Sequence, residues 1–219
     1  MSKQNRRTTE EEKAAGWVSV TRVTDYFTEP ELVEWKVKTG LKEANRISRL
    51  AAKTGTRVHD LIYKDWEDGS YKLIKADSLE VRNCMSAWED FKRNHRINIS
   101  HMEFELRDEA SLVRGYADME AEGIILDIKT SGFIKPRHWI QLATYAKIHK
   151  SKTIAILRLD RNLGIYEFIE KEADSLPTIF SPLLEIYRFY TSANGIEENK
   201  NDHRNSTPDS PTDKEISSR

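Results

Sequence analysis

Apolar and polar residues alternate in short stretches along the second half of the chain, and this two-residue period predicts β-strands. Strands are expected at roughly 100–106, 112–120, 123–129, 153–159 and 165–169. Apolar residues three and four apart predict helices, which are expected at about 29–66, 78–94, 136–149 and 172–190. The segment 17–24 is rich in β-branched residues and is expected to be extended. This order of elements predicts one α/β domain with a central mixed β-sheet flanked by helices.

Polar segments frame the predicted domain. Residues 1–16 have no apolar signal-peptide core and are expected to form a flexible lead-in to a domain at 17–191. Residues 192–219 nearly lack large apolar side chains and are rich in Asn, Ser, Asp and Pro, which predicts a disordered tail. Within the first long helix, Gly40 and Gly55 are expected to act as interruptions.

The composition excludes several classes of protein. Of the 219 residues, 38% are hydrophobic and 32% are charged, and no apolar run approaches the length of a membrane span. The one cysteine, Cys84, rules out an internal disulfide, an iron–sulfur cluster and a zinc site built from several cysteines. A cytoplasmic location is expected, because a single cysteine fits a reducing compartment. The chain has no P-loop, no glycine-rich dinucleotide loop and no recognisable Ser-His-Asp or Cys-His nucleophile.

The stretch 115–130, GYADMEAEGIILDIKT, predicts a β-hairpin with charged chemistry on one face. Asp127 and Lys129 are two residues apart and therefore point to the same side of a strand. A turn at Ala121-Glu122 would place Asp118 opposite Ile125, on the face of Asp127 and diagonal to it. Two carboxylates and an ammonium would then share one polar patch.

This patch has the donor set of a hard-cation site. Mg²⁺ and Mn²⁺ prefer oxygen ligands, and such an ion can polarise a phosphodiester and activate water. A lysine beside the ion can position that water or neutralise developing charge. The alternative reading is a solvated hairpin face that carries these charges without a metal.

A run of basic residues precedes the hairpin, at Lys38, Lys42, Arg46, Arg49, Lys53 and Arg57. Their spacing of three and four residues forms one stripe on a continuous helix, suited to a phosphodiester backbone. The alternative reading is an ordinary solvated helix face, and a break at Gly55 would spoil the alignment.

Further candidates lie on both sides of the hairpin. Gln141 and Tyr145 share a helix face and can bond phosphate oxygens or orient a metal-bound water, although tyrosine at helical spacing is usually half-buried structure. His59 lies on a largely apolar helix, where a core histidine is the commoner role. Glu103 and Glu105 alternate on a strand, and which of them faces the site, if either does, stays open.

These motifs, in the order GTRVH, GYAD, ILDIKT and QLATY, resemble the PD-(D/E)XK nuclease superfamily in its RecB-like exonuclease branch. The segment VSVTRV also resembles the opening of stand-alone members of that branch. The resemblance covers about residues 17–150. The subgroup that holds an iron–sulfur cluster on four cysteines is excluded, because this chain has one cysteine.

The resemblance implies a role for each matching residue. Asp118 and Asp127 would be ligands of Mg²⁺ or Mn²⁺, with the carbonyl of Ile128 and the side chain of His59 joining them. Lys129 would be the catalytic lysine. Gln141 and Tyr145 would support the site and contact the DNA backbone.

The function expected from these observations is a metal-dependent DNA nuclease, expected to be an exonuclease, in DNA recombination, repair or replication. The basic stripe would steer the strand. By analogy with the family, a recombinase, annealing protein or helicase is a plausible partner, and no membrane is involved. The competing class is a non-catalytic nucleic-acid-binding or assembly protein on a nuclease-like scaffold.

Overall fold

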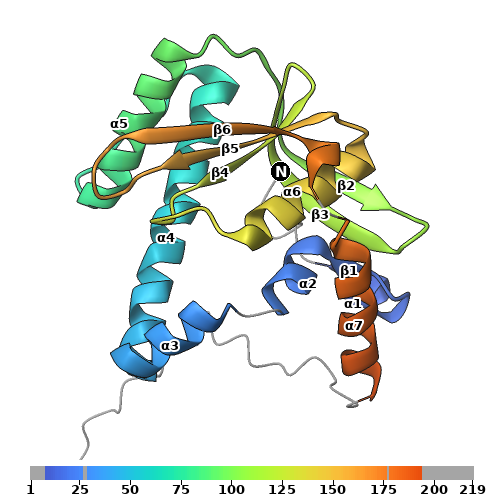
Figure 1. The fold of residues 1–219 in the computed structure, drawn as a ribbon. Coiled ribbons are helices and arrows are strands. Elements are labelled where there is room, and N and C mark those ends of the chain that lie inside the picture. Colours follow the sequence, from blue (N-terminus) through green and yellow to red (C-terminus); the bar gives the residue numbers. More distant parts are fainter. Residues whose placement is uncertain (1–7, 27–28, 177, 194–219) are drawn as a thin grey trace, which may run out of the picture.

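A mixed β-sheet runs through the centre of the fold, with helices on both of its faces (Figure 1). The computed structural model describes residues 8–26, 29–176 and 178–193. Within these ranges the strands are β1 (Val18–Ser19), β2 (Ile99–Asp108), β3 (Val113–Ala121), β4 (Ile124–Lys129), β5 (Thr153–Leu159) and β6 (Tyr166–Glu172). The paired order is β1-β3-β4-β5-β6, and β2 also pairs with β3. The pairs β1–β3 and β4–β5 are parallel and the other pairs are antiparallel.

The helices in the described ranges form two layers around this sheet. They are α1 (Glu10–Ala14), α2 (Val20–Tyr26), α3 (Pro30–Thr39), α4 (Leu41–Asp68), α5 (Leu79–Asn94), α6 (Pro136–His149), the short 3₁₀ helix η2 (Ala173–Ser175) and α7 (Phe180–Ala193). One layer is α4 with α5, and the other is α2 with α6 and α7. The predicted fold class, an α/β domain with a mixed sheet flanked by helices, is confirmed.

Strand β5 shows how the core forms on both faces. Ala155, Leu157 and Leu159 face α4 and α5, whereas Ile154 and Ile156 face α2, α6 and α7. A strand buried on both faces is apolar almost continuously, as TIAILRL is. The parallel pair β4–β5 therefore lies at the centre of the sheet, and it pairs β4 to its last residue, Lys129.

Two boundaries differ from the sequence-based expectation. Only Val18–Ser19 is extended in the segment 17–24, and helix α2 follows at once, because Val20 and Val23 are three apart and both are buried against the sheet. The last helix begins at Phe180, not near residue 172, because the chain to Glu172 completes β6 against β5.

Of the two expected helix interruptions, one is present in the structure and the other is not. Gly40, at φ 82°, ends α3, as predicted, but α4 runs through Gly55 without a break. A Cβ on Gly55 would lie 3.2 Å from the Thr130 hydroxyl oxygen, so this glycine permits close packing of α4 against the connection after β4.

The predicted flexible lead-in over residues 1–16 is wrong for Glu10–Ala14, which form helix α1. Thr9 caps this helix in a capping box with Glu12, and the Glu12 carboxylate also bonds Arg107 at 2.7 Å and pairs with Arg114. The predicted tail begins too early, since α7 continues to Ala193, and residues 194–219 lie outside the described part. No helix among the described residues is both long and apolar enough to cross a bilayer.

Candidate active site

The hairpin β3–β4 is closed by a two-residue turn at Glu122 and Gly123. Both residues have positive φ, 53° and 80°, which is the conformation of a type I′ turn. Ala121 pairs with Ile124, so the turn predicted at Ala121-Glu122 is wrong by one residue. The shift matters for the site because Asp118 then falls level with Asp127, and not diagonal to it. Both carboxylates still belong to one face of the sheet, as the sequence predicts.

The site lies where the paired ladder of this hairpin ends. The last pair is Met119 with Leu126, and Asp118 and Asp127 are the next residues on each strand. Asp118 Oδ2 accepts the backbone N–H of Ile128 at 2.9 Å. A carboxylate therefore replaces the next backbone bond between the strands, and it is held in place by β4 itself.

His59 reaches this point from α4. Its Nδ1 lies 3.5 Å from Asp118 Oδ1, and its Nε2 donates to the Ile128 carbonyl at 3.1 Å. Burial disfavours a charged imidazole here, but the Asp118 carboxylate outweighs that effect and raises the pKa of His59. Three of the residues expected to hold a metal, His59, Asp118 and Ile128, thus contact one another directly.

Asp127 and Lys129 form the other half of the site. The ammonium of Lys129 lies 2.6 Å from Asp127 Oδ2, and the Asp127 side chain is only 4% exposed. Oδ2 is a buried oxygen that has this ammonium as its ion-pair partner and no other hydrogen-bond partner among the described residues. A buried carboxylate oxygen with so few partners, beside a second carboxylate, is an environment that a hard cation fits.

In this site, neighbouring opposite charges act against the effect of burial on each pKa. Burial raises the pKa of Asp127 to about 6, with Lys129 acting against the rise and Asp118 adding to it. Burial also opposes the charge on Lys129, yet two carboxylates raise the pKa of that ammonium. Both pKa values rise, but with opposite effects on charge. The rise disfavours the ionised carboxylate of Asp127, because burial and Asp118 outweigh Lys129, and it favours the charged ammonium of Lys129, because two carboxylates outweigh burial. The pKa of Asp118 is lowered, since His59, Lys129 and the Ile128 amide outweigh its burial.

The described residues contain no group of three His, Cys, Asp or Glu side chains already placed around one point. A divalent ion at the site would therefore use Asp118 and Asp127 with a backbone carbonyl, that of Ile128, and solvent. Mg²⁺ and Mn²⁺ commonly keep several waters when one or two carboxylates bind them. The donor set fits such an ion, and the His59 ring is the further candidate ligand.

Tyr145 and Gln141 support the site from α6. Gln141 Nε2 donates to the Tyr145 hydroxyl oxygen at 3.0 Å. The Tyr145 ring is fully buried against Gly115, where an added Cβ would overlap the ring. The first glycine of the GYAD motif is therefore the residue that makes room for the tyrosine of the QLATY motif.

A cavity of about 280 Å³ opens beside these groups, between α2, α4, the end of β4 and the first turns of α6. Of the predicted residues it is bordered by His59, Ile128, Lys129 and Gln141. Tyr145 lies behind this wall.

Several other residues border the cavity that were not among the predicted site residues, among them Asp25, Arg137, His138 and Thr21. Arg137 and His138 border it from α6, and Thr21 borders it from α2 and hydrogen-bonds Tyr145. Thr21 is the threonine of the VSVTRV segment, so a signal for it was present in the sequence.

The predicted basic stripe is divided in the structure. Lys38 belongs to α3, beyond the break at Gly40, and pairs with Glu34 at 3.5 Å. Arg46 bonds Glu43 through two nitrogens. Arg57 bonds Asp77 in the same bidentate way, at 2.7 and 3.0 Å. The expectation of one stripe on one helix is therefore wrong for Lys38, whereas the other five residues lie on the unbroken helix α4.

Lys42, Arg49 and Lys53 remain as exposed cations along α4. Residues Ala52, Gly55 and His59 turn toward the cavity. At about 100° per residue, the three cations point about a third of a turn away from those residues, and none of them borders the cavity. They are placed to meet a bound strand outside the cavity and not within it.

The strand register shows which of the two glutamates on β2 lies nearer to the site along the sheet. Glu105 lies opposite Tyr116 and pairs with Arg107 at 3.2 Å and with Arg114 at 2.5 Å. Glu103 stands between residues that pair with Met119 and Ala117, which brings it level with Asp118. Its φ is 51°, an uncommon backbone state for a glutamate. Glu103 is thus the β2 carboxylate nearest in register to the site.

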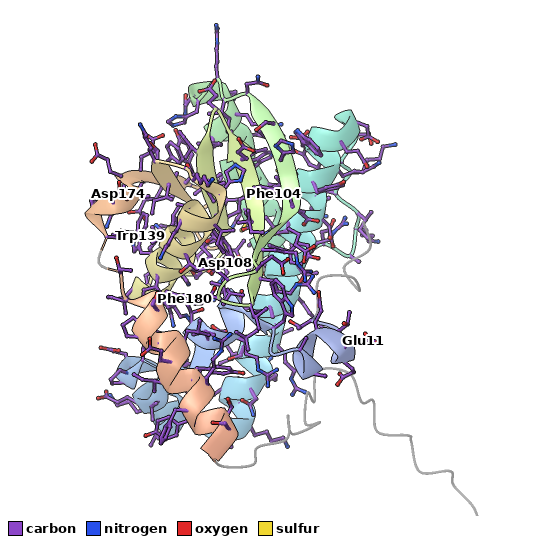
Figure 2. The ribbon with its side chains drawn as sticks, turned by 90° about the vertical axis from the view of Figure 1, so that its right-hand side faces the viewer. Glu11, Phe104, Asp108, Trp139, Asp174 and Phe180 are labelled. Carbon is purple, nitrogen blue, oxygen red and sulfur yellow. The ribbon has the colours of Figure 1, made fainter. Side chains whose placement is uncertain are left out.

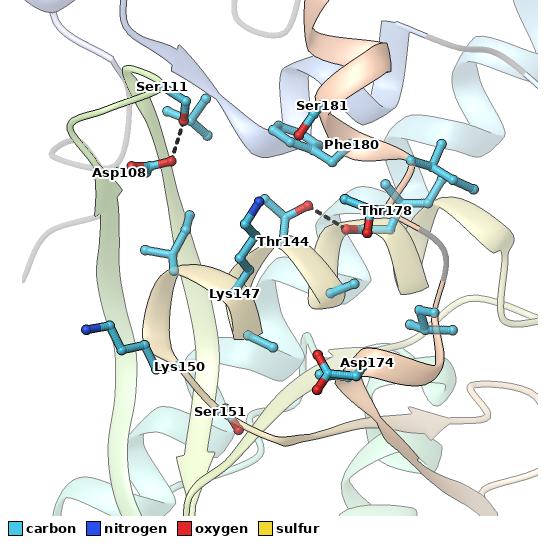
Figure 3. A pocket seen from close by; sticks show the side chains of 18 of the residues that line it. Asp108, Ser111, Thr144, Lys147, Lys150, Ser151, Asp174, Thr178, Phe180 and Ser181 are labelled. Carbon is cyan, nitrogen blue, oxygen red and sulfur yellow. Dashed lines mark hydrogen bonds between the residues drawn. The ribbon is translucent and has the colours of Figure 1, made fainter.

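A larger cavity, of about 520 Å³, lies on another part of the molecule (Figure 3). Its wall combines Asp108 at the end of β2, Lys147 of α6, Asp174 of η2 and Phe180 of α7 (Figures 2 and 3). None of the predicted site residues borders it. Size alone does not make it the active site, because the carboxylates, lysine and histidine of the four motifs converge elsewhere.

Comparisons with known proteins add little to this geometry. A scan against protein-family models and a search of curated proteins found no match. Among solved structures, the crystal structure of SSO0001 is similar with a TM-score of 0.48 and 14% identity, over 88% of this chain and 81% of that one. An alkaline exonuclease (LHK-Exo) from Laribacter hongkongensis is similar with a TM-score of 0.47 and 16% identity, over 85% and 94%. Its complex with dAMP gives a TM-score of 0.41 and 15% identity, over 85% and 99%.

Proposed function

We propose that this protein is a metal-dependent deoxyribonuclease that hydrolyses phosphodiester bonds and acts as an exonuclease in DNA recombination, repair or replication. The observation that carries the proposal is the meeting of Asp118, Asp127, Lys129 and His59 at one end of β4, beside a cavity. Motifs that are separate in the sequence supply these residues. A solvated hairpin face, the alternative reading of the carboxylates, does not fit two half-buried or buried aspartates.

The residues divide the chemistry among them. Asp118, Asp127 and the Ile128 carbonyl would hold Mg²⁺ or Mn²⁺, with His59 as a further ligand. When bound, such an ion polarises the phosphodiester and makes water a better nucleophile. Lys129 places a positive charge at the cavity wall, where it neutralises charge that develops on the phosphate. Gln141 and Tyr145 fix the position of the α6 wall against β3.

The proposal is tested by cleavage of linear and circular DNA, each single- and double-stranded, with Mn²⁺, Mg²⁺ or EDTA. Metal-dependent loss of linear but not circular substrate is expected, and Lys129→Ala and Asp118→Ala should abolish it while the proteins stay folded. Cutting of circles would move the protein to the endonucleases. Cleavage by purified Asp118→Ala at the rate of the unmodified protein would refute the assignment of the site.

A second function, binding of nucleic acid without cleavage, is favoured by one observation. His59, Asp118 and the Ile128 carbonyl already satisfy one another without a metal. DNA binding with no cleavage under any metal would support this function. Recombinase, annealing-protein or helicase partners belong to the same proposal and rest on the family resemblance alone.

A further inference from the structure

His138 is a buried histidine at the candidate active site that the proposed chemistry leaves unused. It lies in the first turn of α6 and is 7% exposed. It borders the same cavity as Lys129 and His59. A histidine that is nine-tenths buried and still reaches a cavity needs a reason in its hydrogen bonding.

The protonation of this ring is fixed by the backbone. The N–H of Lys135 donates to His138 Nδ1 at 3.2 Å, so Nδ1 carries no proton and Nε2 does. No residue of the described chain accepts a hydrogen bond from Nε2. Burial, with the nearby charges of Lys129, Arg137 and Lys135, lowers the pKa of His138 to about 3, which keeps the ring neutral.

The surroundings of Nε2 favour an anion. Lys129 and Arg137 border the cavity with it, and the start of the 14-residue helix α6 adds the positive end of the helix dipole. Two carboxylates lie close by and each faces a cation: Asp25, which also borders the cavity, bonds Arg137 at 3.1 Å, and Glu29 bonds Lys135 at 2.7 Å and lies 3.7 Å from Arg137. An uncommitted N–H donor among cations is suited to a phosphate oxygen.

We propose that His138 Nε2–H and the first turn of α6 form a phosphate-binding subsite, which holds one phosphodiester of the bound strand beside Lys129. The inference rests on the proposed function, because it names the part of the substrate that this wall of the cavity receives. His138 is a positioning residue here. Its ring donates a hydrogen bond and takes no part in proton transfer.

Two substitutions separate the two nitrogens of this ring. His138→Asn places an amide oxygen near the position of Nδ1, where it can still accept the Lys135 N–H, but it has no donor at the position of Nε2. His138→Gln places an amide nitrogen near Nε2 and loses the acceptor. His149→Gln is the matched control, because His149 lies on the same helix and faces Glu120 at 3.5 Å instead.

The experiment is binding of a fluorescent single-stranded oligonucleotide in EDTA, from pH 6 to pH 8, beside thermal unfolding of each variant. We expect His138→Asn to keep its unfolding temperature and to weaken binding about tenfold to a hundredfold, the effect of losing one hydrogen bond to a charged group. The weakening should not change across this pH range, since a neutral ring does not titrate there. His138→Gln should recover part of the affinity, and His149→Gln should match the unmodified protein.

The outcomes also separate this inference from the nuclease itself. Cleavage by the unmodified protein with unchanged binding in His138→Asn would overturn the subsite and leave the proposed function standing. Binding that depends on His138 without any cleavage would support the subsite and count against the nuclease. No binding of the oligonucleotide by the unmodified protein would overturn the subsite.

Discussion

Gly115 has no side chain, and this leaves the space that the Tyr145 ring occupies. We predict that Gly115→Ala destabilises the fold by about 1–3 kcal/mol and greatly reduces cleavage, because a methyl group there overlaps the Tyr145 ring. Displacing that ring would also move Gln141, which bonds the tyrosine hydroxyl. Thermal unfolding and initial rates of cleavage measure both effects.

Gly132 provides the matched control for this prediction. It follows β4 by three residues, and an added Cβ would meet nothing within 4 Å. Gly132→Ala should therefore leave both the stability and the rate close to those of the unmodified protein. A Gly115→Ala protein that behaves like Gly132→Ala would show that Tyr145 is not held in this way.

Arg57 is a structural residue in this fold. It binds Asp77, whose side chain is 5% exposed, and the Lys72 carbonyl. We predict that Arg57→Ala lowers the free energy of unfolding by about 2 kcal/mol at pH 7, the loss of hydrogen bonds to a charged group. Arg46→Ala, which breaks an equally bidentate but exposed pair with Glu43, should lower the free energy of unfolding less than Arg57→Ala does.

This difference should depend on pH. The hydrogen bonds from Arg57 hold the pKa of Asp77 below its ordinary value. A carboxyl group with a depressed pKa stabilises the fold only while it is ionised. Its contribution is therefore present above about pH 4 and lost as the pH falls through its folded pKa. Urea unfolding at pH 7 and near pH 3 should show the gap between Arg57→Ala and the unmodified protein closing in acid.

Contacts between side chains were predictable where both residues belong to one strand or helix. They were not predictable where the contact joins two separate elements. Asp127 and Lys129 share a strand face, so their meeting follows from a two-residue period. The Arg57–Asp77 pair joins a helix to a loop twenty positions on, and no period connects them. The role of His138 was missed for the same reason, since it depends on a cavity built by α2, α4 and α6 together.

Among the helices, α4 carries three exposed cations of the predicted stripe, Lys42, Arg49 and Lys53. We predict that replacing Lys42, Arg49 and Lys53 together by Gln weakens DNA binding and lowers its salt dependence, by about one unit of slope for each phosphate that is no longer neutralised. The rate of cleavage at saturating DNA should not change, because these cations lie away from the cavity. Binding measured across a several-fold range of salt concentration tests the slope, and an unchanged slope would make this surface an ordinary solvated face.

Element boundaries followed the sequence where burial is periodic and departed from it at glycines and short segments. α5 and α6 lie where their apolar spacing predicts. Gly55 sits inside α4 because tertiary packing against Thr130 outweighs its weak helix preference. Val20–Tyr26 is helical although its β-branched residues favour strands, since burial of Val20 and Val23 sets its conformation.

At the scale of the entire molecule, the candidate site lowers the free energy of unfolding when no metal is bound. Asp127 is buried facing Asp118, and its raised pKa means that ionising it costs folding free energy as the pH rises from about 4 toward 6. We predict that Asp127→Asn raises the unfolding temperature in EDTA at pH 7, because a buried carboxylate no longer has to ionise beside Asp118.

Added Mn²⁺ should reverse the order of the two proteins. A ligand that binds only the folded state stabilises it by about 2.7 kcal/mol at one hundred times its dissociation constant. The unmodified protein should gain this stability and Asp127→Asn should not. Equal shifts in both proteins would place the metal elsewhere.

The layered arrangement was predictable because it follows from element order, whereas the position of the site within it was not. A strand with apolar residues on both faces requires cover on both sides, and helices before and after it supply that cover. The convergence of four motifs at the end of β4 depends on the parallel pairing of β4 with β5, which no local pattern specifies.

The two-residue turn at Glu122 and Gly123 makes the hairpin intolerant of a change in length. Side chains on a strand change face at every step, so one residue inserted or deleted there would offset β3 against β4 by one position. Asp118 and Asp127 would then turn to opposite faces of the sheet, with every functional residue retained. Among natural variants of this chain, activity should therefore tolerate substitution at Glu122 far better than any insertion beside it.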